Sequence, residues 1–292
     1  MRFRGQLSES LKAHEPRDTP ARIHALDTTL FSAIHSESTD DDKRSLLRLQ
    51  DCVRSEGDYT YLEIGSYMGG SLQPYYADPA CTCTYSIDRR PGFQPDERGR
   101  LFSYKKSENS RQTMLDNLAR AFPAVLPSKV LTFDCDATEL DPRRFETKPK
   151  ICFIDGEHTD RAAYSDFQFC RKIADHDGII VFHDADLVFR AIRRAENLLT
   201  SESVRFASVL LPHCVYAILL NGAVDAYLPK LEPFGIDREH YFRKVEQRLA
   251  LVQEKNRRSK IRQLRDWLSN YPRLYEFLRT IKGLFMQNSI RP

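Results

Sequence analysis

The sequence lacks a CxxC pair although it contains seven cysteines, so zinc-ribbon and thioredoxin-like motifs are not expected. Cys135, Cys152 and Cys214 lie in apolar runs, which favours buried, reduced thiols and a cytoplasmic compartment. The first residues carry no apolar signal-peptide core. No run of about 18 apolar residues is present, so no membrane-spanning helix is expected.

The sequence also has little charge of one sign, with a net charge of +3 in 292 residues. A nucleic-acid-binding protein usually carries a larger basic excess, and we therefore expect no nucleic-acid partner. No internal repeat is evident, and the length fits one core with terminal additions.

Seven short apolar segments have the composition of buried strands. They are Tyr59–Ile64, Cys83–Asp88, Val130–Phe133, Ile151–Ile154, Ile179–Phe182, Phe206–Leu211 and Val215–Leu220. Helical periodicity fills the intervals at about 21–35, 41–55, 109–122, 162–173 and 187–199, and a helix begins within 69–76. This alternation predicts an α/β, doubly wound, seven-stranded sheet that is mostly parallel with an antiparallel terminal hairpin.

We expect four parts of the chain: a flexible N-terminus at 1–20, N-terminal helices at 21–57, the α/β domain at 58–222 and a helical extension at 223–292. The extension ends in a basic amphipathic helix, because apolar residues from Leu274 to Leu284 share one face. Such a face packs on its own domain or on a second subunit of a homo-oligomer. Peripheral attachment to an anionic membrane surface is the alternative.

Acidic residues follow the predicted strands, at the edge where such sheets bind ligands. The segment from Glu63 to Ser71 has the spacing E-x-G-x-x-x-G-G, in which Gly65 and Gly69 permit a tight turn close to a ligand. It is not the G-x-G-x-x-G of dinucleotide-binding proteins. Glu63 suits a cationic group such as an α-amino group.

Two further carboxylates suit a nucleoside. Asp88 ends the second predicted strand, where a carboxylate can accept both hydroxyls of a ribose. Asp136, after the third, can accept from an adenine amino group or form an Asx turn.

These three features together resemble the S-adenosylmethionine (SAM)-binding motifs of the class I methyltransferases. The segment Phe153–Thr159, which contains IDGEH, Asp166 and the segment Gly178–Asp184, which ends in VFHD, resemble one branch of small-molecule O-methyltransferases. That branch includes antibiotic-sugar and cephamycin-type enzymes, and the resemblance covers about residues 58–220. It implies a Rossmann-like fold and SAM as the cofactor. The residues implied to bind SAM are Glu63, Gly65, Ser66, Gly69, Ser71, Asp88, Asp136 and Asp155.

The resemblance also implies a metal site and a catalytic base. Relatives that use Mg²⁺ hold it with a residue at the position of Asp155 and with an acidic pair, which here is His183–Asp184. Magnesium prefers oxygen ligands, so His183 suits another divalent metal better. His158 is the candidate general base, assisted by Asp155, because imidazole titrates near neutral pH. His183 is an alternative base or orients Asp155.

The sequence therefore predicts O-methylation of a hydroxyl on a small molecule, sugar or glycan. A non-catalytic SAM-fold protein that acts in binding or assembly is the main alternative. A dinucleotide-dependent oxidoreductase is disfavoured by the glycine spacing and by the lack of a Tyr-x-x-x-Lys pair. Acceptor specificity is expected from residues 21–55, 89–106 and 221–237.

Overall fold

A computed structural model describes residues 18–105, 107–268 and 271 of the chain. The chain divides into two units, residues 1–245 and 246–292. The predicted amphipathic helix after Pro272 lies outside the described residues, as does most of the predicted flexible N-terminus. No helix within the described ranges is long and apolar enough to cross a membrane.

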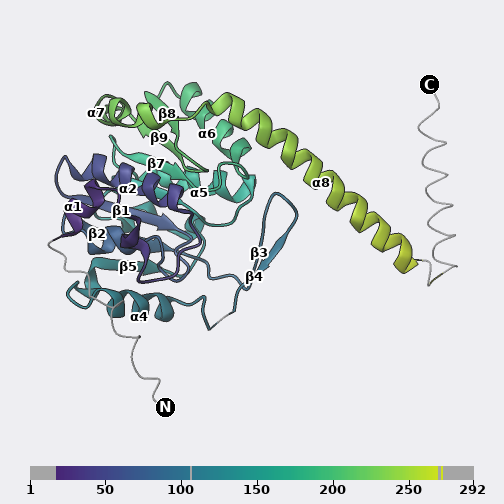
Figure 1. Cartoon of the computed structure of the whole chain (residues 1–292), viewed down its shortest axis with the longest axis horizontal. Helices are drawn as coiled ribbons and strands as arrows, with labels where there is room; N and C mark the ends of the chain where they lie inside the picture. The colour runs from purple at the N-terminus through teal and green to yellow at the C-terminus, as the bar shows by residue number, and fades with distance from the viewer. Residues whose placement is uncertain (1–17, 106, 269–270, 272–292) are drawn as a thin grey trace, which may run out of the picture. The chain divides into compact units, whose positions relative to one another are not determined.

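A seven-stranded sheet forms the centre of the first unit. The strands are β1 (Tyr59–Ile64), β2 (Cys81–Ile87), β5 (Val130–Phe133), β6 (Ile151–Ile154), β7 (Ile179–Phe182), β8 (Phe206–Leu210) and β9 (Tyr216–Leu220). Their order is β5-β2-β1-β6-β7-β9-β8, with β8 and β5 at opposite edges (Figure 1). Only the pairs β7–β9 and β8–β9 are antiparallel. The predicted fold class is confirmed, and four of the strands have the predicted bounds.

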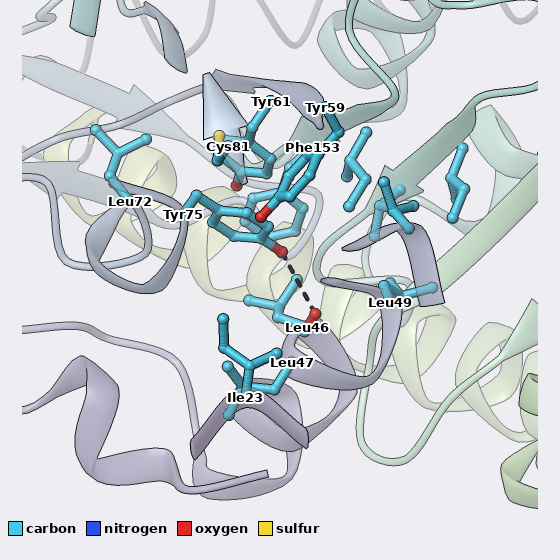
Figure 2. Close-up of a cluster of buried hydrophobic side chains, with 14 of the residues drawn as sticks. Ile23, Leu46, Leu47, Leu49, Tyr59, Tyr61, Leu72, Tyr75, Cys81 and Phe153 are labelled. Atoms are coloured by element: carbon cyan, nitrogen blue, oxygen red, sulfur yellow. Dashed lines mark hydrogen bonds between the residues drawn. The ribbon is translucent and has the colours of Figure 1, made fainter. Parts of the chain in front are cut away.

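Helices cover both faces of the sheet. They are α1 (Thr19–His24), α2 (Asp40–Arg54), α3 (Gln73–Ala77), α4 (Arg111–Ala121), α5 (Asp160–Ile173), α6 (Phe189–Ser201) and α7 (Gly222–Leu231). The last helix, α8 (Arg238–Leu268), continues into the second unit. One face packs on α1–α4 and α7, where Tyr75 stacks on Tyr61 with ring centroids 3.6 Å apart (Figure 2). On the other face, Phe167 of α5 stacks on Phe182 of β7. Because strand side chains alternate between faces, the central strands are apolar throughout.

The N-terminal residues do not form the single helix predicted over about 21–35. Helix α1 ends at His24, Leu26 has a left-handed φ of 54°, and a short 3-10 helix follows at Thr28–Phe31. Asp27 caps that 3-10 helix through its side chain, which accepts from the Thr29 amide at 3.0 Å. A capping aspartate competes with helix continuation, and this local bond explains the break.

A small hairpin was not predicted. Strands β3 (Phe93–Pro95) and β4 (Leu101–Ser103) pair with each other outside the main sheet, within the segment where acceptor specificity was expected (Figure 1). Phe93 and Leu101 are exposed on it. The hairpin buries little apolar surface and therefore leaves no clear hydrophobic period in the sequence.

Helix α7 adds Ala223, Tyr227 and Leu231 to the same core as the sheet. The boundary at residue 222 remains a prediction. All seven cysteines are free thiols, and Cys152 and Cys214 are buried as predicted. Cys135 is only partly buried, so that prediction was wrong: it follows the edge strand β5 and faces a cavity.

Candidate active site

A cavity of about 320 Å³ opens at the carboxyl ends of β1, β2, β5, β6 and β7. This volume is within the range of roughly 300–1,000 Å³ typical of small-molecule sites. Nine of the residues singled out from the sequence line it: Gly65, Ser66, Ser71, Asp88, Asp136, Asp155, His158, His183 and Asp184. Glu63 and Gly69 do not reach its surface, so the cavity unites most of the predicted site.

The turn after β1 depends on glycine at position 65. Gly65 has φ of +95°, and a Cβ there would lie 2.1 Å from the carbonyl oxygen of Asp155. No L side chain fits this position, because both the backbone angle and the space exclude it. The turn therefore brings the backbone of β1 directly against the end of β6, where the acidic residues begin.

Glu63 lies just below this turn and is fully buried. Ser71 Oγ donates to Glu63 Oε1 at 2.5 Å, and the Tyr61 hydroxyl donates to Oε2 at 2.8 Å. Burial raises the pKa of Glu63 to about 8, an effect that these two hydrogen bonds oppose. Ser71, which lines the cavity, separates Glu63 from it, so a cation in the cavity would interact with the charge of Glu63 without touching the carboxylate.

Asp88 is buried at the end of β2 and holds the turn after β1 and the loop after β2 through hydrogen bonds. Its carboxylate accepts from the Tyr67 amide at 2.8 Å and from the Arg90 amide at 2.7 Å. The Arg90 guanidinium adds an ion pair at 3.3 Å. Asn109 lines the cavity beside this loop, and its buried Oδ1 has no hydrogen-bond partner. A buried acceptor without a donor is costly, and a ligand hydroxyl or amine would satisfy it.

Two further carboxyl groups lie at the far end of the cavity. Asp136 Oδ1 accepts from the Thr138 amide at 3.0 Å, so the Asx turn that was one interpretation of this residue is present. Asp166 of α5 is buried in the cavity wall. Burial, together with the nearby charges of Asp136 and Glu157, raises the pKa of Asp166 to about 7. This end of the cavity thus holds a carboxyl group that can donate as well as accept.

His158 and Asp184 form the closest ion pair of the site. Nδ1 of His158 lies 2.5 Å from Asp184 Oδ2, while Nε2 lies 4.0 Å from Asp155 Oδ1. Burial lowers the pKa of His158, but the hydrogen bond and the charge of Asp184 outweigh it and hold the pKa above its usual value. With Nδ1 engaged by Asp184, Nε2 is the nitrogen that remains able to take up a proton.

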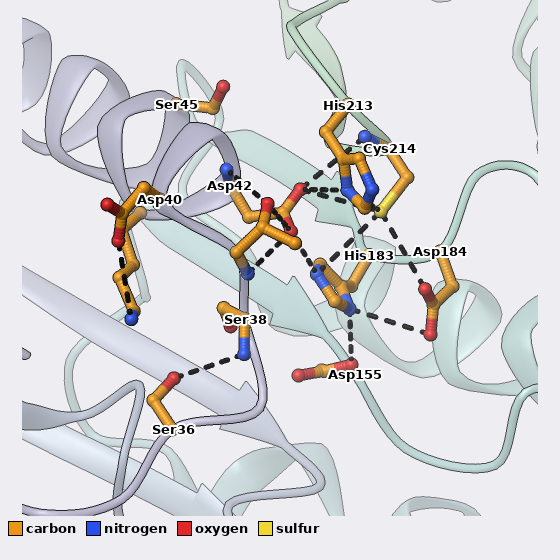
Figure 3. A network of polar contacts seen from close by, with 12 residues as sticks. Ser36, Ser38, Asp40, Asp42, Ser45, Asp155, His183, Asp184, His213 and Cys214 are labelled. Carbon is orange, nitrogen blue, oxygen red and sulfur yellow. Dashed lines mark hydrogen bonds and ion pairs between the residues drawn. The ribbon is translucent and has the colours of Figure 1, made fainter.

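His183 lies between carboxylates on both of its edges. Its Nδ1 is 3.0 Å from Asp155 Oδ1 and 3.6 Å from Asp184 Oδ2. Its Nε2 is 3.5 Å from Oδ2 of Asp42, a residue of α2 that the sequence did not single out (Figure 3). Burial lowers the pKa of His183, but Asp155 and Asp184 outweigh this effect and raise the pKa well above its usual value.

The cavity has two walls that the motifs do not predict. Residues 35–38 form one of them, and a Cβ at Gly70 would lie 2.2 Å from the His35 carbonyl oxygen. Gln94, Arg98 and Phe102 of the β3–β4 hairpin form the other. The second glycine of the pair 69–70 therefore serves packing of the N-terminal segment, which no local pattern indicates.

The hairpin is joined to the loop that carries His158. The Glu97 amide donates to the His158 carbonyl at 3.0 Å, and Glu97 Oε1 accepts from the Asp160 amide at 2.9 Å. These bonds position the start of α5 and the candidate base together.

Residues 62–185 match the model of a family described as a methyltransferase domain. The chain is similar in structure to the O-methyltransferase NovP, with 10% identity, 70% of this chain and 100% of that chain covered, and a TM-score of 0.53. It is also similar to CalS11, a calicheamicin methyltransferase, with 16% identity, coverage of 76% and 99%, and a TM-score of 0.44. TomG from Streptomyces achromogenes, an O-methyltransferase in complex with SAM, shares 16% identity, with coverage of 73% and 92% and a TM-score of 0.46. The similarity to NovP shows a shared fold, and no curated protein matches the sequence significantly.

Proposed function

We propose that the chain is a class I SAM-dependent methyltransferase, with residues 62–185 as its methyltransferase domain, and that it methylates a hydroxyl oxygen of a small molecule or sugar. The observation that carries the proposal is the pair of His158 and Asp184, 2.5 Å apart in the wall of the cavity. It is an arrangement suited to removing a proton from a neutral hydroxyl.

The residues around the cavity fit SAM. Bound SAM would supply an electrophilic methyl group on a sulfonium. We propose that Gly65, Ser66, Gly69 and Ser71 form the turn that receives its amino-acid end, with Glu63 as the negative charge behind Ser71. Asp88 and the unpartnered Oδ1 of Asn109 suit ribose hydroxyls, and Asp136 suits an adenine amino group.

His158 is proposed as the general base. Asp184 accepts from Nδ1 and thereby fixes the tautomer in which Nε2 is free. The acceptor hydroxyl would give its proton to Nε2 as its oxygen bonds to the methyl carbon and the carbon–sulfur bond of the sulfonium breaks, with S-adenosylhomocysteine as the leaving group. Asp184 would stabilise the imidazolium that forms. Asp155, 4.0 Å from Nε2, adds negative charge on the same side of the ring.

The carboxylates beside His158 do not fit a Mg²⁺ ion. Mg²⁺ requires an octahedron of oxygen atoms, whereas here the imidazole of His183 lies between Asp155 and Asp184. Asp155, His158 and Asp184 offer only two carboxylates, and one is already paired with a histidine. No step of the proposed transfer therefore uses a metal at Asp155, His183 and Asp184. A divalent ion bound by these three residues remains a prediction, and the site would suit metals softer than Mg²⁺.

The acceptor is proposed to enter between the β3–β4 hairpin and residues 35–38. Arg89 pairs with Glu157 at 3.2 Å, and Arg98 pairs with Asp96 at 2.6 Å. Since both guanidinium groups already have carboxylate partners, we favour a polar, hydroxyl-bearing acceptor over a strongly anionic one. Phe102 offers an apolar surface at the same opening.

The experiment that tests the function is a methyl-transfer assay on the purified chain, with production of S-adenosylhomocysteine as the readout. Sugars, nucleotide sugars and phenols would serve as the acceptor panel, after calorimetry with SAM and, separately, NAD⁺. SAM binding with turnover of one acceptor class supports the proposal. SAM binding without turnover of any acceptor, unchanged in His158→Ala, would favour the non-catalytic alternative.

Three expectations from the sequence remain proposals. They are the division of the chain at residues 20, 57 and 222, assembly into a homo-oligomer, and membrane attachment through the helix predicted after Pro272. Sedimentation of the full chain with anionic vesicles, compared with a chain that ends at residue 271, would test the last of these.

A further inference from the structure

We propose that the chain binds a transition-metal ion of the zinc type on the Nε2 side of His183, through a cluster formed by Asp42, His213 and Cys214. These residues come from the start of α2 and from the turn between β8 and β9, and they converge beside His183 (Figure 3). Asp42, His213 and Cys214 all lie outside residues 62–185, so the cluster is not part of the matched methyltransferase domain.

The distances within the cluster suit one central ion. His213 Nδ1 lies 3.0 Å from Asp42 Oδ1 and 3.1 Å from Cys214 Sγ, and Sγ lies 3.4 Å from Asp42 Oδ1. Around a tetrahedral zinc with its usual bond lengths, neighbouring ligand atoms are roughly 3.3–3.6 Å apart. The three donor atoms therefore need to move only a few tenths of an ångström.

Hydrogen bonding leaves one contact of the Cys214 thiol unsatisfied. Cys214 Sγ has four polar atoms within 3.9 Å, on Asp42, His183, Asp184 and His213. The histidine nitrogens can donate to the sulfur, but the single thiol proton can be donated to only one of the two carboxylates at a time. A cation that replaces the thiol proton would satisfy the sulfur and its neighbours together.

Asp42 has one carboxylate oxygen available for an ion. Its Oδ2 accepts from the amide and the hydroxyl of Thr39, at 3.0 and 2.6 Å, and so completes the capping box of α2. Its Oδ1 points instead to His213 and Cys214. The side chain of Asp42 is 1% exposed, which places this negative charge inside the protein.

His183 is the fourth donor. Its Nε2 lies 3.5 Å from Asp42 Oδ2 and 3.9 Å from Cys214 Sγ, and its Nδ1 lies 3.0 Å from Asp155 Oδ1. A histidine that binds a metal through one nitrogen commonly donates from the other to a carboxylate. Asp155 is in position to be that carboxylate, which would fix His183 as a neutral ligand.

The donor set selects the ion. A thiolate, imidazoles and a single carboxylate favour Zn²⁺, Co²⁺ or similar ions over Mg²⁺ and Ca²⁺. Binding would release the thiol proton of Cys214 and one proton from His183 to solvent, and two negative ligands would then balance the divalent charge.

The side chain of His213 is 51% exposed, so an ion can enter the cluster from the side of His213. Its backbone has a left-handed φ of 67°, a conformation that normally favours glycine or asparagine.

The test uses the full chain loaded with Zn²⁺ and, in parallel, with Co²⁺, then dialysed against metal-free buffer. We expect one zinc ion per chain by elemental analysis and a sulfur-to-metal charge-transfer band in the cobalt form. Cys214→Ser should abolish the band. His213→Ala should weaken zinc binding by more than about tenfold, the loss seen when outer-shell partners alone are removed.

Matched controls separate this result from misfolding. Cys52→Ser removes a buried thiol from α2, the helix that carries Asp42, and His24→Ala removes a histidine paired with Asp51. Both variants should keep the band. SAM titration of each variant reports folding independently of the metal, so loss of the proposed methyltransferase function would be distinguishable. The proposal is overturned if the wild-type chain retains no zinc, if Cys214→Ser keeps the band, or if only Asp155→Asn and Asp184→Asn lose the ion.

Discussion

The two edges of the His183 ring face clusters of different origin. Nδ1 faces Asp155 and Asp184, which follow β6 and β7 within the matched domain. Nε2 faces Asp42 and Cys214, which come from an N-terminal helix and a distant turn. The first side holds the candidate base against the cavity, and the second joins segments far apart in the sequence. One residue therefore separates a proposed chemical role from a proposed structural one.

The largest effect should come from removing the proposed base, His158, on the Nδ1 side. His158→Ala is expected to lower turnover by about 10²–10⁴-fold, the usual contribution of a general base. SAM affinity should stay the same, because His158 is proposed to act on the acceptor. His24→Ala is the matched control, and calorimetry with steady-state kinetics provides both readouts. Full activity of His158→Ala would remove His158 from the mechanism.

The pH dependence of turnover should follow His158. The base must be neutral, and Asp184 raises its pKa, so turnover should rise with pH and fall by about tenfold per unit below that pKa. In Asp184→Asn the charge is lost while the shape is kept, and the midpoint should shift to lower pH. A pH–rate profile with the same midpoint in both proteins would contradict the assignment.

These predictions use residues that the sequence itself indicated. The acidic residues after β1, β2, β6 and β7 could be predicted to meet, because parallel strands end at one edge of the sheet. The contact of Asp42 with His183 could not, since it joins residues 141 positions apart through tertiary packing. Asp42 has an ordinary local role as well, in the capping box that begins α2.

The prediction also failed where side chains are exposed or locally bonded. The β3–β4 hairpin has no apolar alternation, and Phe93 and Leu101 remain exposed on it. The predicted helix over 21–35 is interrupted by Asp27, whose cap outweighs a helical spacing of leucine and isoleucine. Hydrophobic periodicity indicates burial against a core, and it says little about exposed segments, such as the β3–β4 hairpin, that line a cavity.

On the Nε2 side, the expected effect is on stability. Asp42→Ala should lower the free energy of unfolding at pH 7 by about 1–3 kcal/mol, because a cap and one partner of a buried ion pair are lost. SAM affinity should change little. Asp42→Asn can still cap α2, so comparing both variants by chemical denaturation separates the cap from the charge.

The same variant has a defined pH dependence. Burial raises the pKa of Asp42, but His183 and Thr39 lower it by more than burial raises it. The pKa of Asp42 in the folded protein therefore lies below the unfolded value of 3.8. Its stabilising contribution is therefore present above that value and is lost as the pH falls through the folded pKa. The gap between wild type and Asp42→Ala should narrow in acid, and a constant gap would argue against the ion pair.

The smallest expected effect is a proton count. Glu63 has a pKa of about 8 in the ligand-free chain, so much of it is protonated at pH 7. The positive charges of SAM should lower that pKa, and binding should release a fraction of a proton. Calorimetry in two buffers with different ionisation enthalpies measures this release. Binding heats that do not depend on the buffer, or that depend on it equally in Glu63→Gln, would contradict it.

The two hydrogen bonds from Glu97 link the hairpin at the wall of the cavity to the candidate base His158. The hairpin cannot swing outward without breaking its hold on the His158 carbonyl and on the first amide of α5. An acceptor that displaced the hairpin would therefore move the imidazole of His158 away from its position in the cavity wall. An acceptor that left the hairpin in place would leave the imidazole in that position. Selection of the acceptor by shape would then act directly on the reaction rate, without any separate recognition step.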